Sequence, residues 1–324
     1  MTHPPKRITS ADVARAAGVS RTTVSFVLND RPGQSIPEET RRRVLEAARS
    51  LDYRPHASAR ALAAGRSDIV LLAVPDLPIG PGISRFVEEL AAALADHRLT
   101  LVTHLTGARG RPLPDVCATL SATAVIGFDS FEPAMVEALH RAGASVVLPA
   151  EGAASAMSEI GRLQAEHLIG RGHRRLGYAM PTDSGLRPMA EARLEGAARA
   201  CAVAELDRPV ALDTGMEIAE AALAVTGWTA RSVTGVCAFN DEIAMAVLAG
   251  MREHGLAAPA DIAVIGADDV PAARLTAPPL TTVAYDLREV GRRRAEAVAA
   301  GLMGDDPHPA LARTSERVIE RSST

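Results

Sequence analysis

The sequence predicts an α/β protein in which a small helical headpiece precedes a larger body of alternating strands and helices. The 324 residues exceed the length of one usual domain, which is about 100 to 200 residues. The content of 47% hydrophobic and 23% charged residues is typical of a globular chain with a buried core. Residues 1–66 hold 12 Lys and Arg against 6 Asp and Glu, while the remainder holds 23 against 33. A basic head on an acidic body favours a polyanion as the partner of the head.

Two short helices around a glycine are predicted first. The first helix starts at a cap, Thr9 or Ser10, ends at Gly18, and buries one face: Val13, Ala14 and Ala17. Ser20 can cap the second helix, whose buried face is Val24, Val27 and Leu28. Because Gly18 allows a tight turn between them, the two helices are predicted to form a helix-turn-helix.

A third helix is predicted within IPEETRRRVLEAARSLDY, residues 36–53. Pro37 suits its first turn, and Glu38 and Glu39 lie at the positive end of the helix dipole. Its inward face is expected to be Val44, Ala48 and Leu51. The N-terminal segment is therefore expected to be a three-helix headpiece.

The body alternates apolar strands with amphipathic helices in two series. Strands are expected at 69–74, 99–104, 122–128 and 145–149, and then at 174–180, 235–240 and 262–267. Such alternation predicts two parallel sheets covered on both faces by helices, and therefore two lobes. Ligands of open α/β sheets bind beyond the carboxyl ends of the strands, so we expect a ligand in the cleft between the lobes.

Composition and spacing exclude several enzyme classes. Lys6 is the only lysine, so the body can form neither a P-loop nor a pyridoxal Schiff base. The chain has no G-x-S-x-G or H-E-x-x-H pattern, and GPGISR at 80–85 lacks the third glycine of a dinucleotide loop. The cysteines Cys117, Cys201 and Cys237 form no C-x-x-C pair and are expected to be buried thiols. We expect no catalytic residue, metal ion or cofactor.

The sequence also bears on location. Every apolar run is shorter than the roughly 18 to 20 residues that span a membrane. The segment Met1–Arg15 lacks the apolar core of an export signal. We therefore expect a cytoplasmic protein.

The segments DVARAAGVSRTTVSFVLN and YRPHASARALAAGRS resemble the DNA-binding headpiece and the hinge of the LacI/GalR family of bacterial transcription regulators. Further blocks resemble the same family in its own order: HLIGRGHRRLGYAMP, RLEGA, VCAFNDEIAMAVL, DIAVIGADD, PPLTTVAYDLREVG and RVIERS. The resemblance covers nearly the whole chain. It implies a headpiece at 1–55, a hinge at 56–67 and a periplasmic-binding-protein-like body at 68–324. Lobe 1 would comprise about 68–157 and 287–312, and lobe 2 about 158–286 and 313–324.

The resemblance implies that residues 20–28 form the helix that enters the major groove of DNA. Arg21 and Thr22 would read bases, since arginine reaches guanine O6 and N7 and threonine meets an acceptor or a thymine methyl group. Phe26 stands where many relatives carry a third base-reading arginine; it packs on a thymine methyl group or is a partly buried headpiece residue. Phosphate contacts are implied for Ser20, Ser25, Asn29 and Thr40.

For the hinge, the resemblance implies that Leu62 wedges into the minor groove and that Ala59 lets two paired hinge helices approach closely. The segment is too short to be a stable helix alone, so it is expected to order on DNA in a dimer. Closure of the body would change the spacing of the two hinges and thereby couple the effector to the operator.

In the body, the resemblance implies four effector contacts: Arg193, Asn240, Asp268 and Tyr285. Their donors and acceptors suit hydroxyl groups, so a sugar-like effector is expected. Asp241 and Asp269 are equally plausible as helix caps. Relatives often place an aromatic residue where this chain has Thr214–Met216, and Trp228 falls elsewhere. Because Asp268 would face a solvated cleft, we expect the fold to survive Asp268→Asn while effector affinity falls.

These inferences predict a homodimeric transcription regulator, most simply a repressor, that binds a palindromic operator in double-stranded DNA. A dimer is expected instead of a tetramer, because no heptad repeat follows the body. The alternative is a solute-binding protein or an enzyme on the same two-lobed body. An exported binding protein would carry a signal peptide and no basic headpiece, which is the reverse of this sequence.

Overall fold

The computed structural model describes residues 8–28, 36–53, 67–75, 79–106, 110–127, 131–148, 153–306 and 316–324. The predictions for Asn29, Ala59 and Leu62 lie outside these residues. Contacts divide the chain into two units, Met1–Asp68 and Ile69–Thr324. Each unit has its own apolar core, so each is described by itself.

The first unit is a three-helix headpiece with α1 (Ser10–Ala17), α2 (Arg21–Leu28) and α3 (Glu38–Ser50). Its core contains most of the residues that the periodicity selects, with Val13, Val24 and Val44 fully buried. The cap of α1 is Thr9, whose amide and hydroxyl donate to Asp12 Oδ2 at 2.9 and 2.7 Å. Gly18 ends α1 with a φ of 65°, a left-handed conformation in which glycine carries no Cβ penalty. The predicted helix-turn-helix is confirmed.

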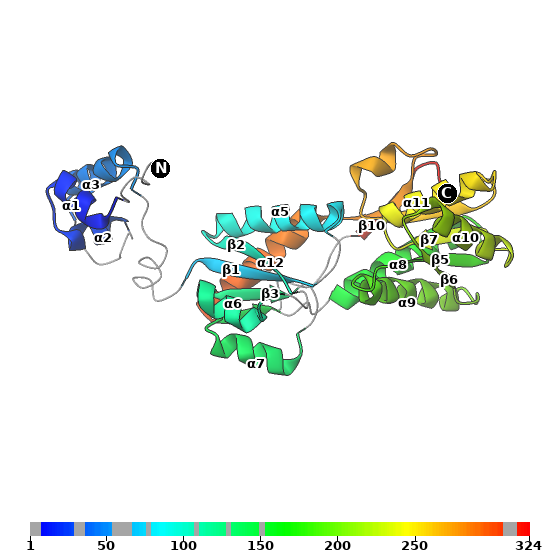
Figure 1. Cartoon of the computed structure of the whole chain (residues 1–324), viewed down its shortest axis with the longest axis horizontal. Helices are drawn as coiled ribbons and strands as arrows, with labels where there is room; N and C mark the ends of the chain where they lie inside the picture. Colours follow the sequence, from blue (N-terminus) through cyan, green and yellow to red (C-terminus); the bar gives the residue numbers. More distant parts are fainter. Residues whose placement is uncertain are drawn as a thin grey trace, which may run out of the picture. The chain divides into compact units, whose positions relative to one another are not determined.

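In the second unit, lobe 1 is built on a four-stranded parallel sheet in the order β2-β1-β3-β4. Side chains of the central strand alternate between two layers, as the period of two requires. Val70, Leu72 and Val74 pack with α5 and α12, whereas Leu71 and Ala73 pack with α6 and α7 (Figure 1). The elements are β1 (Ile69–Val74), α5 (Pro81–Asp96), β2 (Thr100–Leu105), α6 (Leu113–Leu120), β3 (Ala124–Gly127), α7 (Pro133–Arg141), β4 (Val146–Leu148) and α12 (Leu287–Met303).

Lobe 2 is built on a six-stranded sheet in the order β10-β9-β8-β7-β5-β6. Five strands are parallel, and β10 runs antiparallel to β9, so the expectation of two purely parallel sheets needs correction at this edge. The elements are α8 (Ala153–Gly170), β5 (Leu176–Pro181), α9 (Arg187–Val203), β6 (Val210–Thr214), α10 (Ile218–Thr229), β7 (Gly235–Ala238), α11 (Asp241–Glu253), β8 (Ala263–Ala267), the short 3₁₀ helix η1 (Pro271–Arg274), β9 (Thr281–Tyr285) and β10 (Glu316–Ile319).

Two glycines let α8 and α9 pack backbone against backbone. A Cβ on Gly161 would lie 1.7 Å from the backbone oxygen of Arg193, and a Cβ on Gly196 would lie 1.7 Å from that of Ser158. No side chain fits at these distances, so the two helices can meet only at glycine. This contact fixes the part of α9 that carries Arg193.

The prediction that the cysteines are buried thiols is confirmed in the body. The three cysteines are free and buried. Trp228 is fully buried in the core of lobe 2, where its indole N–H donates to the backbone oxygen of Val210 at 2.9 Å. Gly80 is the N-cap of α5, and Pro81 is the first residue of that helix. Among the helices that the structure describes, none is long and apolar enough to cross a membrane.

Candidate functional site

Helix α2 presents one continuous exposed face. Val24 and Val27 are buried in the headpiece core. With successive residues about 100° apart, the opposite side of the helix carries Arg21, Thr22, Ser25 and Phe26. The first three of these side chains are exposed, and the fourth is half-buried and outside the apolar cluster of the headpiece. Both interpretations of Phe26 therefore remain predictions.

The residues predicted to hold phosphates lie around this face. Ser20 is exposed and caps α2, since the amide of Thr23 donates to Ser20 Oγ at 3.0 Å. The predicted cap is therefore confirmed. Thr40 is half-buried in the first turn of α3. A hydroxyl that caps a helix can still donate its own hydrogen, so Ser20 can serve both purposes.

The centre of the predicted effector site is a buried ion pair. Nη2 of Arg193, on α9, donates to Oδ1 of Asp268, which follows β8, at 3.2 Å. The two side chains are 3% and 13% exposed. Nη1 of Arg193 donates to the backbone oxygen of Phe239, and the guanidinium carbon lies 4.7 Å from the centroid of the Phe239 ring. Burial is the strongest influence on the pKa of Arg193 and would lower it, but Asp268, Tyr285 and Tyr178 together outweigh burial, and the pKa is raised above its ordinary value.

Tyr285, the last residue of β9, joins the same carboxylate. Its hydroxyl donates to Asp268 Oδ1 at 3.3 Å. Burial raises the pKa of Tyr285, and the negative charge of Asp268 raises it further, so the hydroxyl stays a donor. Three of the four predicted effector residues are thus joined by hydrogen bonds in a single cluster.

The second oxygen of Asp268 faces lobe 1. Within the described ranges, no donor takes Asp268 Oδ2, while Oδ1 accepts from both Arg193 and Tyr285. A Cβ on Gly82, in the first turn of α5, would lie 3.2 Å from Oδ2. Oδ2 is therefore the oxygen of Asp268 that no described donor occupies.

Asn240, the fourth predicted residue, is partly committed to structure. It caps α11, where its Oδ1 accepts from the amide of Ile243 at 2.9 Å. Its Nδ2 donates only weakly, to Glu242 Oε2 at 3.4 Å, and is the atom left for a ligand.

The interpretation of Asp241 and Asp269 as helix caps is wrong. Asp241 is fully buried below the turn that carries Asp268 and accepts from the amide of Val270. Asp269 pairs with Arg321, and its second oxygen lies 3.5 Å from Arg274. The prediction was wrong because each carboxylate interacts instead with a residue that is distant in sequence.

Three further residues at this site were not predicted from the sequence. Phe239 and Glu242 flank Asn240 directly beyond β7, so their place after the carboxyl end of a strand was a usable signal. Glu242 Oε2 lies 3.0 Å from the position of a Cβ on Gly80; burial raises the pKa of Glu242, and the charge of Asp268 raises it further. Tyr178 lies within β5, and nothing in the sequence marked it.

Two buried polar atoms have no hydrogen-bond partner among the described residues around the pair, the hydroxyl of Tyr178 and Nε of Arg193. Tyr178 is fully buried, and its pKa is raised by burial, with Arg193 opposing the rise and Asp268 adding to it. The Tyr178 hydroxyl and Arg193 Nε are therefore donors that no described residue of the protein uses.

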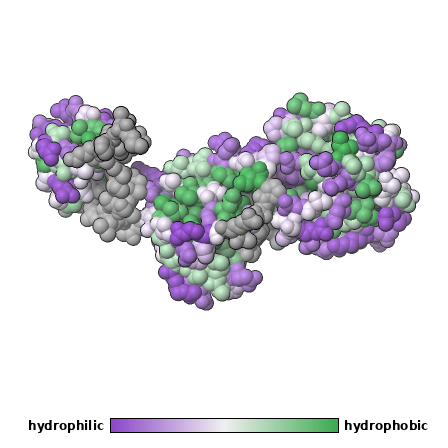
Figure 2. All heavy atoms as spheres, viewed as in Figure 1, coloured by the Kyte–Doolittle hydropathy of each residue, from purple (hydrophilic) through white to green (hydrophobic). Residues whose placement is uncertain are grey.

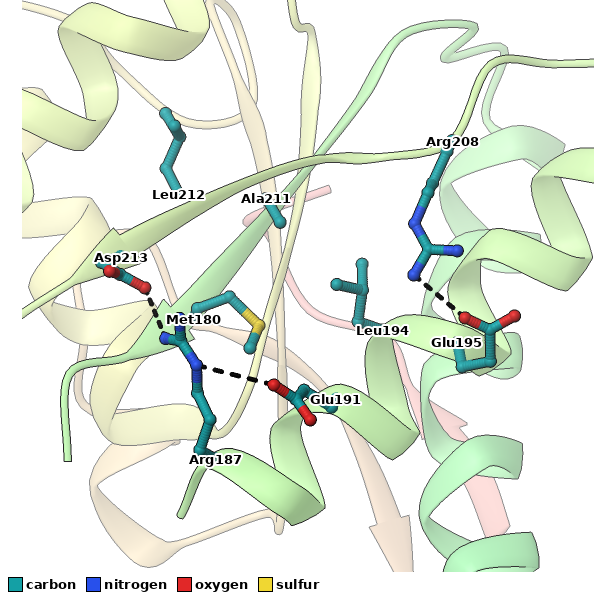
Figure 3. A pocket seen from close by; sticks show the side chains of 9 residues that line it. All are labelled: Met180, Arg187, Glu191, Leu194, Glu195, Arg208, Ala211, Leu212 and Asp213. Carbon is teal, nitrogen blue, oxygen red and sulfur yellow. Dashed lines mark hydrogen bonds and ion pairs between the residues drawn. The ribbon is translucent and has the colours of Figure 1, made fainter. Parts of the chain in front are cut away.

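A hollow of about 670 Å³ lies elsewhere on lobe 2, between α9 and β6 (Figure 3). None of the four predicted effector residues lines it. Its charged side chains pair with one another, Arg187 with Asp213 at 2.6 Å and Arg208 with Glu195 at 2.9 Å. These pairs are at least 40% exposed and mutually satisfied, so the charges that line this hollow are already paired within the protein.

The stretch at which relatives often carry an aromatic residue presents no ring. Thr214 is fully buried, and Met216 is 61% exposed. No group of three or more His, Cys, Asp or Glu residues within the described part of the chain could hold a metal ion.

Comparisons with known proteins agree with this architecture. Residues 9–56 match the model of bacterial regulatory proteins of the lacI family, and residues 165–324 match a periplasmic binding protein-like domain. The HTH-type transcriptional regulator GalR of Escherichia coli (strain K12) is 31% identical, over 97% of this chain and 95% of its own length.

Two solved structures share the fold. The lac repressor dimer bound to operator and the anti-inducer ONPF has a TM-score of 0.75 at 21% identity, covering 98% of this chain and 99% of that one. The transcriptional regulator CelR in complex with cellobiose has a TM-score of 0.63 at 24% identity, covering 98% and 100%. Since the match with GalR extends over nearly both full lengths at this identity, the chain belongs to the lacI family of bacterial transcription regulators.

Proposed function

We propose that this regulator is a repressor that binds a palindromic operator as a homodimer, with α2 in the major groove. The observation that carries the proposal is the continuous exposed face of α2. The residues assigned to base reading are Arg21, Thr22 and Phe26, and those assigned to phosphates are Ser20, Ser25, Asn29 and Thr40. The operator-bound lac repressor, which has the same fold, supports this arrangement.

The effector is proposed to be a small, hydroxyl-rich molecule, such as a sugar, held by Arg193, Asn240, Asp268 and Tyr285. Asp268 Oδ2 is an acceptor and Asn240 Nδ2 a donor that the described contacts leave open or weakly used, which suits hydroxyl groups that both donate and accept. The cellobiose complex of CelR supports a sugar as the class of ligand.

The body is proposed to hold the dimer. Leu223 of α10 is 73% exposed, Ile218 of the same helix is 50% exposed, and Leu275 after η1 is 85% exposed. Figure 2 shows hydrophobic residues, in green, at the surface of the body among hydrophilic ones in purple. Large apolar side chains at a surface are typical of protein interfaces. The lac repressor structure, which is a dimer, supports this assembly.

Effector and operator are proposed to be coupled through the hinge, where Ala59 and Leu62 pair with their copies on DNA and Leu62 enters the minor groove. Regulation then proceeds by binding alone, without a chemical step. A regulator that binds operator DNA works where the chromosome is, so the cytoplasm is the proposed location.

Mapping of bound DNA across the source genome tests the operator proposal. We expect a palindrome whose half-sites are about one helical turn apart. Gel shifts with the palindrome, with one half-site scrambled, and with random DNA then measure the preference. Equal affinity for all three would contradict sequence-specific binding.

Thermal unfolding followed by Trp228 fluorescence tests the effector proposal, because this single tryptophan is buried in lobe 2. Sugars that raise the melting temperature are titrated against the operator complex, and Asp268→Asn is compared with the exposed control Asp207→Asn. The variant is expected to lose about 10- to 100-fold in sugar affinity, the range for a buried hydroxyl left without a partner. Unchanged affinity would show that Asp268 does not contact the sugar.

A further inference from the structure

The carboxylate at the centre of the effector site stands on an unusual turn. Asp268 has a φ of 100° and Asp269 a φ of 45°, so two consecutive residues with side chains adopt left-handed conformations directly after β8. The amide of Asp268 donates to the backbone oxygen of Val283 in the neighbouring strand β9 at 2.9 Å. Such conformations persist only where the surrounding structure over-determines them.

Asp241, the first residue of α11, spans the space below this turn. Its Oδ2 accepts from the amide of Val270 at 2.9 Å, and its Oδ1 accepts from the hydroxyl of Thr282 at 2.6 Å. The same hydroxyl oxygen accepts from the amide of Asp269 at 3.4 Å. One carboxylate thus ties the turn to α11 on one side and to β9 on the other.

The side chain of Asp241 is tightly enclosed. Asp241 is fully buried, and a Cβ on Gly266 would lie 2.2 Å from its Oδ1. A buried carboxylate is costly unless its oxygens are hydrogen-bonded, which both oxygens are here. Asp241 does not cap α11, because Asn240 does. The hydrogen bonds of its carboxylate therefore stabilise the turn and not the start of α11.

We infer that Asp241 is a positioning residue of the effector site. It does not touch the effector; it holds the turn 268–270 so that Asp268 Oδ1 meets Arg193 and Tyr285 while Oδ2 faces lobe 1. The relevance of this role to regulation rests on the proposed function, in which Asp268 binds the effector. The geometric part, that Asp241 determines where Asp268 lies, holds for any ligand.

The test compares Asp241→Ala with Asp241→Asn in the full chain. An asparagine can keep both bonds, with Oδ1 accepting from the amide of Val270 and Nδ2 donating to the hydroxyl oxygen of Thr282. Alanine keeps neither. Thr282→Val removes the hydroxyl with little change of shape and tests the same connection if the alanine variant does not fold.

Hydrogen exchange and crystallography without any ligand give the readouts. In Asp241→Ala and Thr282→Val, the peptide 266–275 should exchange at least about tenfold faster, as the loss of one buried hydrogen bond requires. The strand peptide 176–181 should be unchanged in both, and Asp241→Asn should match the parent. The crystal structure of the alanine variant should show Asp268 Oδ1 separated from Arg193 Nη2.

Each failure has a separate meaning. If Asp268 keeps its conformation and its contact with Arg193 in Asp241→Ala, the inference is overturned. Acceleration spread equally over the peptides 176–181 and 266–275 would also overturn it, because it would indicate a general loss of stability. By contrast, an Asp268→Asn chain that binds its sugar like the parent refutes the proposed function and leaves the role of Asp241 in the turn intact.

Discussion

Asp268→Asn should weaken the fold of lobe 2 in addition to the effector site. From the sequence, Asp268 was expected to face a solvated cleft, so its replacement by an isosteric amide carried no predicted cost in stability. In the structure it is the counter-charge of Arg193, which is only 3% exposed. The substitution leaves that guanidinium buried without an opposite charge.

The size of the effect follows from what Arg193 keeps. Removing one partner of a buried ion pair costs about 3 to 5 kcal/mol. Arg193 retains the backbone oxygen of Phe239 and the face of its ring, and the amide oxygen of the introduced asparagine can still accept one hydrogen bond. The side chain of Asp268 is also 13% exposed, which admits some solvent to the pair. We therefore expect a loss of about 2 to 3 kcal/mol in the free energy of unfolding of lobe 2.

Urea unfolding followed by Trp228 fluorescence measures this loss, since the single tryptophan reports on lobe 2. Asp207→Asn, at an exposed position of the same lobe, is the matched control and should be neutral. Combining Asp268→Asn with Arg193→Met removes both charges and should recover part of the loss, because a neutral, packed pair needs no counter-charge.

A loss below about 0.5 kcal/mol, the usual range of exposed substitutions, would refute the assignment of Asp268 as the counter-charge of a buried arginine. A double variant less stable than the sum of the two single variants would refute it as well.

Three further predictions concern other parts of the chain. Arg21→Ala should cost about 1 to 3 kcal/mol of binding at the preferred operator and relax one base position, with little change on random DNA in gel shifts; equal losses on both would assign Arg21 to phosphate. Gly161→Ala should destabilise lobe 2 by more than about 3 kcal/mol, since its Cβ would lie 1.7 Å from the backbone of α9. Gly170→Ala on the same helix is the control: its Cβ would meet no atom within 4 Å, so urea unfolding should differ little from that of the parent. Burial raises the pKa of Asp241 to about 7 from an ordinary 3.8, so the folded state retains a proton that the unfolded state releases. The resulting stability is present below about pH 4, and about 4 kcal/mol of it is lost as the pH rises to about 7. Asp241→Asn should remove this pH dependence of the free energy of unfolding, and Asp207→Asn should keep it.

The sequence predicted the parts of the fold that show regular periodicity. The strands 69–74 and 262–267 are uninterrupted apolar runs, as parallel strands covered on both faces must be. Strand β6 was missed because it is an edge strand whose first four residues alternate between half-buried and exposed, so it lacks the long apolar run of a strand covered on both faces. The antiparallel strand β10 was missed for the same reason, since its four residues include Glu316 and Arg317 and none is fully buried.

The sequence could predict which residue types form the candidate site, but not the hydrogen bonds that join them. A resemblance can align Arg193, Asp268 and Tyr285 with effector positions, but it does not show that all three share one oxygen. Those bonds join residues 17 and 75 positions apart, and they depend on how α9 sits against the sheet. Gly161 and Gly196 determine that placement. Their role can be recognised only once α8 is known to pack against α9.

The two oxygens of Asp268 differ in their hydrogen bonds, and this difference bears on how an effector acts. Oδ1 is committed to Arg193 and Tyr285, so a ligand need not break the buried ion pair in order to bind. Oδ2 lies beside the first turn of α5 in lobe 1, where a Cβ on Gly82 would be 3.2 Å away. In the proposed function, a hydroxyl that donates to Oδ2 lies at this boundary between the lobes, so its free energy of binding depends on their separation. A ligand shifts a conformational equilibrium only by its difference in affinity for the two states. A hydroxyl bound at Oδ2 under the proposed function supplies such a difference, because it contacts lobe 1 as well only when the lobes are close.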